Sequence, residues 1–275
     1  MAANLAPEEL NTAQFNKIVD LVHRLCGIKL QEGKEMLVQA RLTKRLRELG
    51  LGKFEDYLEH VECDRSGGEL SLMLDLLTTN KTSFFREMRH FEYLRRQVLP
   101  RLKAPGKKIR FWSAGCSSGE EPYSLAIQMR EEIPDIDCRG VRILATDIST
   151  RMLDKARQAT YPRDTLADVP APLVQRYFTR VEGKAERLYR VAESVSGMVQ
   201  LARLNLLDPW PMKGPFDVIL CRNVMIYFDR PTREALVSRF WELLQPGGHL
   251  FLGLSESLMG GTHGLRYVEP AVYVR

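Results

Sequence analysis

The chain has 275 residues, 44% of them hydrophobic and 27% charged, so it can bury a core sufficient for one large domain or two modest ones. Its N-terminus lacks a basic start followed by an apolar core, and no apolar run approaches membrane-spanning length, which argues against secretion and membrane insertion. The formal net charge of +5 is too small for a chain of this size to require a polyanionic partner.

Cysteine and histidine usage sets further limits. The 5 cysteines are odd in number, widely spaced and without a CxxC pair, which favours reduced thiols and a cytoplasmic location. The 5 histidines are scattered and lack the spacing of metal ligands, so no metal site is expected.

Helical periodicity is the only pattern from Asn11 to about Leu102. The first predicted helix has one apolar face and ends before Gly27, a residue type that often caps helix C-termini. The apolar positions of that face are Phe15, Ile18, Val19, Val22 and Leu25. Further helices are predicted from Lys34 to Leu49, from Phe54 to Val61 and from Glu69 to Thr78.

Strands and helices alternate from Lys108 onward, which is the pattern of a largely parallel sheet with crossover helices. The predicted strands are Ile109 to Ser113, Val141 to Thr146, Val199 to Leu204, Phe216 to Cys221 and His249 to Leu254. The segment from Arg266 to Arg275 is predicted to add an antiparallel edge strand. The segment from Leu102 to Lys108 is the expected junction with the helical region.

The run from Arg110 to Glu121, RFWSAGCSSGEE, is typical of a strand that feeds a ligand-binding turn. Gly115 and Gly119 let the backbone approach a ligand without an intervening Cβ. The run lacks both GxGxxG and GK[ST], and Glu120 and Glu121 put negative charge where a phosphate would lie. The loop therefore favours a nucleotide-like ligand with a positive centre over a pyrophosphate.

Asp147 ends the predicted strand VRILATD. An acidic residue at this place in a doubly wound sheet can accept hydrogen bonds from ribose hydroxyls. The alternative is a helix N-cap, because Ser149 and a helical run follow. The residues alone favour neither interpretation.

The segment CRNVMIYF, from Cys221 to Phe228, follows the predicted strand FDVIL. Arg222 and Asn223 would offer fixed donors at the mouth of a parallel sheet, and Tyr227 would offer an aromatic edge with a hydroxyl. In the alternative interpretation the apolar residues of the segment pack in the core and Arg222 is solvated.

The segment TTNKTSFFRE, from Thr78 to Glu87, has a similar ambiguity. Its polar residues Asn80, Thr82 and Ser83 are typical of caps and turns, and its two phenylalanines of a core. Arg86 is the residue that this interpretation leaves unexplained.

Five segments in register, TTNKTSFFRE, WSAGCSSGEEPYSLA, ATDIS, LNLLD and CRNVMIYFD, together resemble the CheR-type chemotaxis receptor methyltransferases. The resemblance implies an α/β, Rossmann-like class I S-adenosylmethionine-dependent methyltransferase domain at residues 89–275, preceded by an all-helical receptor-recognition domain at residues 1–88. It also implies transfer of a methyl group from S-adenosylmethionine to receptor glutamates for chemotactic adaptation, with S-adenosylhomocysteine as the other product.

The resemblance further implies roles for individual residues. The expected cofactor-binding residues are Asn80, Thr82, Arg86, Glu121, Asp147, Asn205, Leu206, Arg222 and Asn223, the last two lining the floor of the site. Glu121 would hold the methionine amino end and Asp147 the ribose hydroxyls, and the adenine would lie between Asn205 and Leu206. Arg86 and Tyr227 would lie near the transferred methyl group and are the expected catalytic residues.

Family members also carry a small antiparallel β-subdomain, expected here at about residues 177–200, within Tyr177 to Gln200. In some members this subdomain grips a peptide tether at the receptor C-terminus and contains a glycine-rich turn. This chain has VEGKAERLY there, with Gly183 as its one glycine, which argues against tether binding.

The predicted second helix carries a basic face formed by Lys34, Arg41, Lys44, Arg45 and Arg47. Taken alone, such a face is most simply solvated. Because the resemblance implies glutamate-rich receptor methylation helices as substrates, this face is expected to dock them electrostatically. A receptor glutamate has an ordinary pKa of roughly 4.3 and is already ionised at neutral pH, so no general base is required.

Two other functions are compatible with parts of the sequence. A nucleic-acid methyltransferase would use a similar fold, but DPWP at Asp208 to Pro211 precedes the strand FDVIL, at whose end the similar DPPY motif belongs. A non-catalytic S-adenosylmethionine-binding regulator would keep the pocket, but retention of Arg86 and Tyr227 speaks against it. No nucleic-acid partner is therefore expected.

Overall fold

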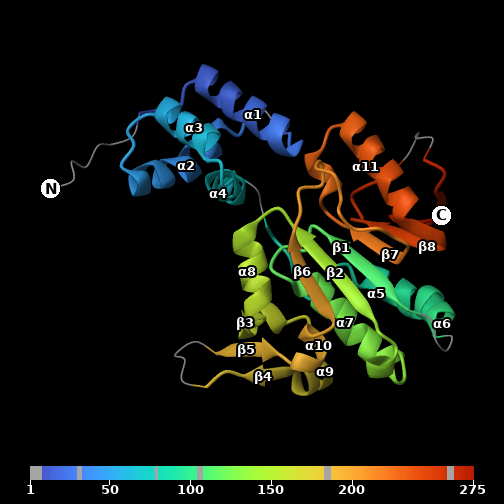
Figure 1. Ribbon diagram of the computed structural model, residues 1–275. Coiled ribbons are helices and arrows are strands. Elements are labelled where there is room, and N and C mark those ends of the chain that lie inside the picture. The colour runs from blue at the N-terminus through green and yellow to red at the C-terminus, as the bar shows by residue number, and fades with distance from the viewer. Residues whose placement is uncertain (1–7, 30–32, 78–79, 104–107, 183–186, 259–262) are drawn as a thin grey trace. The chain divides into compact units, whose positions relative to one another are not determined.

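The computed structural model describes residues 8–29, 33–77, 80–103, 108–182, 187–258 and 263–275 (Figure 1). The chain forms two compact units. The first, called the helical unit below, runs to Asn80 and also includes Tyr227–Thr232. The second, called the sheet unit, contains Lys81–Ile226 and Arg233–Arg275.

The helical unit contains the helices predicted for the N-terminal region. They are α1 Thr12–Cys26, α2 Glu35–Leu49, α3 Phe54–Cys63 and α4 Gly68–Leu77. Asn11 begins α1 through a capping box with Gln14, each side chain accepting from the other residue's backbone N–H at 2.9 Å. Gly27 and Gly50 end α1 and α2 with a left-handed φ of 69° each, a conformation that glycine adopts without steric cost.

The sheet unit is built on a seven-stranded sheet, counted over its described residues, in the order β6-β2-β1-β7-β8-β10-β9. The first five strands in this order are parallel, and β10 and β9 are added antiparallel. The strands are β1 Arg110–Ala114, β2 Arg142–Asp147, β6 Val199–Arg203, β7 Phe216–Cys221, β8 Leu244–Leu252, β9 Arg266–Glu269 and β10 Val272–Val274. The five predicted parallel strands are confirmed, but the expected single edge strand is a hairpin, because β9 and β10 pair with each other.

Helices connect these strands and cover the sheet (Figure 1). They are α5 Met88–Tyr93, η1 Leu94–Val98, α6 Leu99–Leu102, α7 Glu120–Glu132, η2 Ile136–Cys138, α8 Thr150–Gln158, η3 Arg163–Leu166, α9 Ala171–Tyr177, α10 Glu193–Ser196, η4 Met225–Tyr227 and α11 Arg230–Leu243. None of the described helices is long and apolar enough to cross a membrane.

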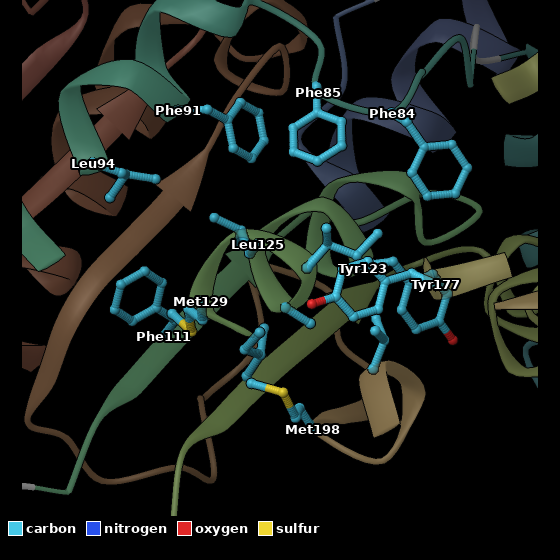
Figure 2. Close-up of a cluster of buried hydrophobic side chains, with 14 of the residues drawn as sticks. Phe84, Phe85, Phe91, Leu94, Phe111, Tyr123, Leu125, Met129, Tyr177 and Met198 are labelled. Atoms are coloured by element: carbon cyan, nitrogen blue, oxygen red, sulfur yellow. The ribbon is translucent and has the colours of Figure 1, made fainter. Parts of the chain in front are cut away.

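Two successive residues of β1 show how the sheet is buried on both faces. Phe111 belongs to a large core cluster with residues of α7 and of the segment from Phe84 to Leu102 (Figure 2). Its neighbour Trp112 points to the opposite face, where it packs edge-on against Phe240 of α11 with a centroid distance of 5.3 Å. A parallel sheet covered on both faces explains the nearly continuous apolar character of its strands.

A second, antiparallel sheet of three strands has the order β3-β5-β4 within the described residues. Its strands are β3 Thr160–Pro162, β4 Phe178–Arg180 and β5 Leu188–Val191. The predicted β-subdomain at Tyr177 to Gln200 contains β4 and β5, whereas β3 precedes that range and pairs with β5. Gly183 lies outside the described residues.

Candidate active site

The order of strands defines where a ligand can bind. From β1 the chain continues to β2 and β6 on one side of the sheet, and later adds β7 and β8 on the other side. In open α/β sheets, ligands bind outside the carboxyl ends of the strands at this switch point, here between β1 and β7. Six of the nine predicted cofactor-binding residues lie at the ends of the four adjacent strands β6, β2, β1 and β7 or in the segments that follow them.

The β1–α7 turn requires its two glycines for different reasons. Gly115 has a φ of 89°, and a Cβ there would lie 2.5 Å from the side chain of Val224. Gly119, with a φ of 97°, would bring a Cβ to 2.9 Å from that of Ala156. Backbone conformation and close packing against neighbouring segments therefore require glycine at both positions, in addition to any approach of a ligand.

The two glutamates that begin α7 have different surroundings. Glu120 is 5% exposed, and the Ser118 hydroxyl donates to both its carboxylate oxygens at 3.0 and 2.8 Å. Burial raises the pKa of Glu120. Glu121 is half-buried and accepts from the Ser113 hydroxyl at 2.6 Å. Its other oxygen accepts from Arg222, which follows the neighbouring strand β7, so Glu121 is the glutamate that connects to the rest of the site.

Asp147 lies at the carboxyl end of β2 and is not a helix N-cap. Its two oxygens accept from the backbone N–H groups of Ser117 at 2.8 Å and Ser149 at 2.9 Å. The N-cap of α8 is instead Ser149, whose hydroxyl accepts from the Met152 backbone at 3.0 Å. Asp147 thereby connects the β1–α7 turn to the end of β2.

The Asn205–Leu206 pair is held next to Asp147 by the strand register. Asp147 pairs with Arg203 at the ends of β2 and β6, and the Leu204 N–H donates to the Asp147 carbonyl at 3.0 Å. The side-chain oxygen of Asn205 accepts from the Leu207 N–H at 3.1 Å, which forms a local turn. Leu206 is 7% exposed.

Arg222 follows β7 and connects two carboxylates. Its Nη1 donates to Glu121 Oε2 at 2.9 Å, and its Nη2 lies 3.0 Å from Glu87 Oε2. The Glu87 carboxylate also accepts from the Asn223 side chain at 3.2 Å and from the Leu254 N–H at 3.2 Å. Burial opposes ionisation of Glu87, but Arg222, the Asn223 side chain and the Leu254 N–H together outweigh it and lower the pKa of that carboxyl. The interpretation of Arg222 as a solvated residue is therefore wrong.

The segment that carries Arg86 is anchored in the core by the residues before it (Figure 2). Phe84 packs edge-on against Phe178 with a centroid distance of 5.3 Å, and Phe85 against Phe91 at 5.2 Å. The guanidinium of Arg86 donates to the Lys81 carbonyl at 2.8 Å. The backbone carbonyl of Arg86 accepts from Arg222 Nη2 at 2.5 Å. This hydrogen bond connects the segment directly to the residue that follows β7.

Three further predicted residues lie at the borders between the segments of the two units. Asn80 and Tyr227 belong to the helical unit, where both are half-buried, and Thr82 follows in the sheet unit. The Tyr227 carbonyl accepts from the Lys29 N–H at 2.7 Å, and Phe228 forms an isolated antiparallel bridge with Ile28.

The basic residues of α2 and its N-cap residue Lys34 fall into two groups. Arg45 forms a two-pronged pair with the buried Glu69 at 2.9 and 2.7 Å, and Arg41 donates to the last carbonyls of α4 at 2.9 and 3.2 Å. The remaining three, Lys34, Lys44 and Arg47, are exposed. Two members of the predicted basic face therefore support the helical unit itself, and three are accessible.

Two carboxylates of the site were not predicted from the sequence. Glu87 binds Arg222 and Asn223, and Glu256, which follows β8, accepts from backbone N–H groups of the β7 loop. An acidic residue just after a predicted strand was the signal that pointed to Asp147, and the same signal would have found Glu256. Glu87 carries no comparable signal, because its partners lie 135 and 136 residues away in the chain.

The described residues contain no cluster of three or more histidine, cysteine or acidic side chains able to hold a metal ion. Burial raises the pKa of the Cys116 and Cys221 thiols well above the ordinary value, so neither is an activated nucleophile.

Comparisons with known proteins identify the family. The model "CheR methyltransferase, SAM binding domain" matches residues 80–274, and "CheR methyltransferase, all-alpha domain" matches residues 13–78. Chemotaxis protein methyltransferase 2 of Pseudomonas aeruginosa is 44% identical over 94% of this chain and 91% of its own length. The chemotaxis protein methyltransferases of Escherichia coli and Borreliella burgdorferi are 41% and 37% identical, over 90% and 94% of this chain and 85% and 93% of their own lengths. The chain therefore belongs to the CheR methyltransferase family and is an S-adenosylmethionine-dependent methyltransferase.

Proposed function

We propose that this chain is a protein-glutamate O-methyltransferase that acts on the cytoplasmic methylation helices of chemoreceptors, producing glutamate methyl esters and S-adenosylhomocysteine. The observation that carries the proposal is the set of charged side chains at the carboxyl ends of three adjacent parallel strands. Glu121 follows β1, Asp147 ends β2 and Arg222 follows β7.

The residues of the site fit the cofactor of the family. Glu121 and Asp147 supply carboxylate acceptors, which suit an ammonium group and a ribose diol and do not suit a pyrophosphate. The Nε of Arg222 is buried and has no hydrogen-bond partner among the described residues, so the site offers a donor that a ligand carboxylate would satisfy. An adenosyl compound with an amino-acid end has all of these groups.

Bound S-adenosylmethionine would supply an electrophilic methyl group on a sulfonium centre. In the proposal, Glu121 holds the amino group and Asp147 the ribose hydroxyls. Asn205 and Leu206 flank the adenine, which the register of β2 and β6 supports by placing them beside Asp147. The other contributors from the sequence prediction are Asn80, Thr82, Arg86, Arg222 and Asn223.

The proposed reaction requires alignment more than proton transfer. A substrate glutamate is ionised at neutral pH, since its ordinary pKa is roughly 4.3. The site has to hold that carboxylate in line with the methyl carbon and the leaving sulfur and to remove water from it, and such positioning can be worth roughly 7 to 11 kcal/mol. We assign Arg86 and Tyr227 to this task.

Recognition of the receptor is assigned to residues 1–88, and methyl transfer to residues 89–275. The exposed basic side chains of α2, namely Lys34, Lys44 and Arg47, would contact acidic methylation helices, while Arg41 and Arg45 would keep α2 and α4 in place. Binding of a receptor C-terminal tether by the β3-β5-β4 sheet forms no part of the proposal. The reaction would take place in the cytoplasm, as the cysteine pattern also predicts.

The comparisons do not favour the two other functions. The relatives carry the name chemotaxis protein methyltransferase, whereas a nucleic-acid methyltransferase or a non-catalytic regulator would be expected to match other families. The presence of Arg86 and Tyr227, the two residues assigned to alignment of the reactants, likewise supports turnover.

One assay separates the three functions. The protein is incubated with methyl-labelled S-adenosylmethionine and receptor-containing membranes, and the labelled product is treated with base. Volatile labelled methanol is expected, because base hydrolyses a carboxyl methyl ester. Arg222→Ala should abolish the signal, and a matched variant at an exposed arginine of η1, Arg95→Ala, should retain it. Base-stable label would contradict the proposal in favour of N-methylation, and absence of label in the wild type would favour a regulator.

A further inference from the structure

Glu256 is a buried carboxylate bound mainly by backbone amides. It follows β8 and is 8% exposed. Its Oε2 accepts from the N–H groups of Asn223 at 2.9 Å and Gly253 at 2.5 Å, and its Oε1 accepts from that of Ile226 at 3.0 Å. Burial raises its pKa, which these hydrogen bonds only partly oppose. No cation is paired with this carboxylate among the described residues, so its place in the fold is unlike that of Glu121 or Glu87.

The three amides belong to loops that follow two neighbouring strands. Asn223 and Ile226 lie after β7, and Gly253 lies after β8, which pairs with β7. A side chain at Gly253 would collide with the hydrogen bond between Glu256 and Asn223. A Cβ there would lie 2.8 Å from the backbone nitrogen of Asn223 and 2.9 Å from Glu256 Oε2. The Glu256 carboxylate therefore joins the loop after β7 to the loop after β8 through hydrogen bonds to both, an arrangement called the Glu256 clip below.

The clipped loop has an unfavourable backbone conformation. Asn223 has a φ of 58°, in the left-handed region that non-glycine residues adopt rarely. Its backbone N–H is fixed by Glu256 and its side chain by Glu87 at 3.2 Å. Arg222, the preceding residue, points back to Glu121 and Glu87. The orientation of the Arg222 and Asn223 side chains thus depends on the backbone conformation of the loop after β7, which the hydrogen bonds to Glu256 stabilise.

We infer that Glu256 is a positioning residue, which holds Arg222 and Asn223 in the arrangement that binds the cofactor. This inference rests on the proposed cofactor roles of those two residues. Loss of the carboxylate would release the N–H groups of Asn223 and Ile226 and let the strained loop relax, which would displace the guanidinium without removing it. The effect should therefore appear in cofactor binding as well as in stability.

The test compares Glu256→Gln with a control carboxylate of similar burial in the neighbouring strand β7. Asp217, at the opposite end of β7, is 4% exposed and accepts from the Arg110 N–H at 2.9 Å and the Gln245 side chain at 2.5 Å. Asp217→Asn thus also removes a buried carboxylate, but one that lies at the amino end of β7, away from the carboxyl ends of the strands. Affinity for S-adenosylhomocysteine is measured by calorimetry and stability by urea unfolding.

Glu256→Gln should weaken S-adenosylhomocysteine binding about tenfold or more, because a carboxamide leaves one amide donor without its acceptor. Turnover measured at saturating cofactor should fall by up to about 100-fold, since small misplacements of catalytic groups have effects of that size. Asp217→Asn should lower stability and leave affinity within twofold. Equal affinity of Glu256→Gln and wild type would overturn the inference, as would an equal loss of affinity in Asp217→Asn.

Two further measurements keep the result interpretable. Hydrogen exchange of the backbone amides of residues 223 and 226 should accelerate in Glu256→Gln and not in Asp217→Asn, and unchanged protection would contradict the clip. If Glu256→Gln does not fold, Glu256→Asp is used, which keeps the charge but shortens the reach by one methylene. Failure of wild-type protein to bind S-adenosylhomocysteine would instead refute the proposed site as a whole.

Discussion

Arg222 and Glu121 form an ion pair that connects the end of β7 to the first turn of α7, with a distance of 2.9 Å between Nη1 and Oε2. The Arg222 side chain is 2% exposed, so the pair is largely removed from water. The same guanidinium also neutralises Glu87 at 3.0 Å. Both carboxylates have lost part of their hydration, so the stability of their charged forms depends on this single cation.

Replacement of Arg222 should therefore affect stability as well as binding. Arg222→Ala is expected to lower the free energy of unfolding by about 3 kcal/mol or more, because it leaves two partly buried carboxylates without a counter-charge. Urea unfolding checks this. The double variant Arg222→Ala with Glu87→Gln should recover part of the loss, and a double variant less stable than the single one would contradict the explanation.

Asp147→Asn should weaken cofactor binding and also lower stability. The carboxamide keeps one oxygen for a backbone N–H, but it leaves the other of the Ser117 and Ser149 N–H groups without its acceptor and loses acceptor capacity for the ribose hydroxyls. Affinity for S-adenosylhomocysteine is expected to fall about tenfold, as for the loss of a hydrogen bond to a charged group. The matched measurement uses an analogue without the 2′-hydroxyl. If replacing S-adenosylhomocysteine by that analogue lowers the affinity of wild type and variant by the same factor, Asp147 does not recognise this hydroxyl.

Arg86→Ala and Tyr227→Phe should both reduce turnover, but in different ways. Removal of the Arg86 guanidinium takes a cation from the segment joined to Arg222, so affinity for the cofactor should fall together with kcat. Tyr227→Phe removes one hydroxyl and should lower kcat with little change in affinity. Calorimetry with S-adenosylhomocysteine and initial-rate kinetics separate the two effects. Unchanged affinity in Arg86→Ala would refute its cofactor role.

The two groups of basic residues on α2 should respond differently to mutation. Lys44→Glu with Arg47→Glu changes only exposed side chains, so receptor methylation should fall while stability is kept. The defect should shrink as salt is added, since exposed charges are screened over about 10 Å at 0.1 M ionic strength. A defect that does not depend on salt would argue against electrostatic docking.

Arg45→Ala is the complementary case. It leaves Glu69, which is 6% exposed, without its two-pronged partner, so the helical unit should lose stability. Thermal unfolding of the full chain measures this. Unchanged stability, together with impaired methylation, would instead place Arg45 in the receptor interface.

Two buried histidines predict sensitivity to acid. Burial lowers the pKa of His90 and of His249 to about 4, whereas an unfolded histidine has a pKa of about 6.5. The unfolded chain therefore takes up protons first, and the stability contributed by the neutral side chains is lost as the pH falls from about 6.5 to about 4. Urea unfolding near pH 7 and near pH 5 tests this. The variants His90→Gln and His249→Gln should show a smaller difference between the two pH values than wild type.

Local sequence was sufficient for most secondary structure. The parallel strands are short apolar runs between turn residues, and all five were predicted because burial on both faces leaves such runs. Gly27 ended α1 as expected because left-handed backbone favours glycine. The β3 strand was missed: it has three residues and is stabilised by pairing with β5, which lies some distance along the chain.

The sequence by itself indicated the class of ligand, since the missing glycine fingerprint and the adjacent glutamates argue against a phosphate-binding loop, and five motifs in register imply the family. Only the tertiary structure decided which charged groups act together. Glu121 rather than Glu120 joins Arg222, Asp147 bridges two loops instead of capping α8, and Glu256 clips the loop after β7. Local patterns cannot specify such pairs, because the partners are brought together by strand order and register, and the Arg222–Glu121 pair alone spans 101 positions.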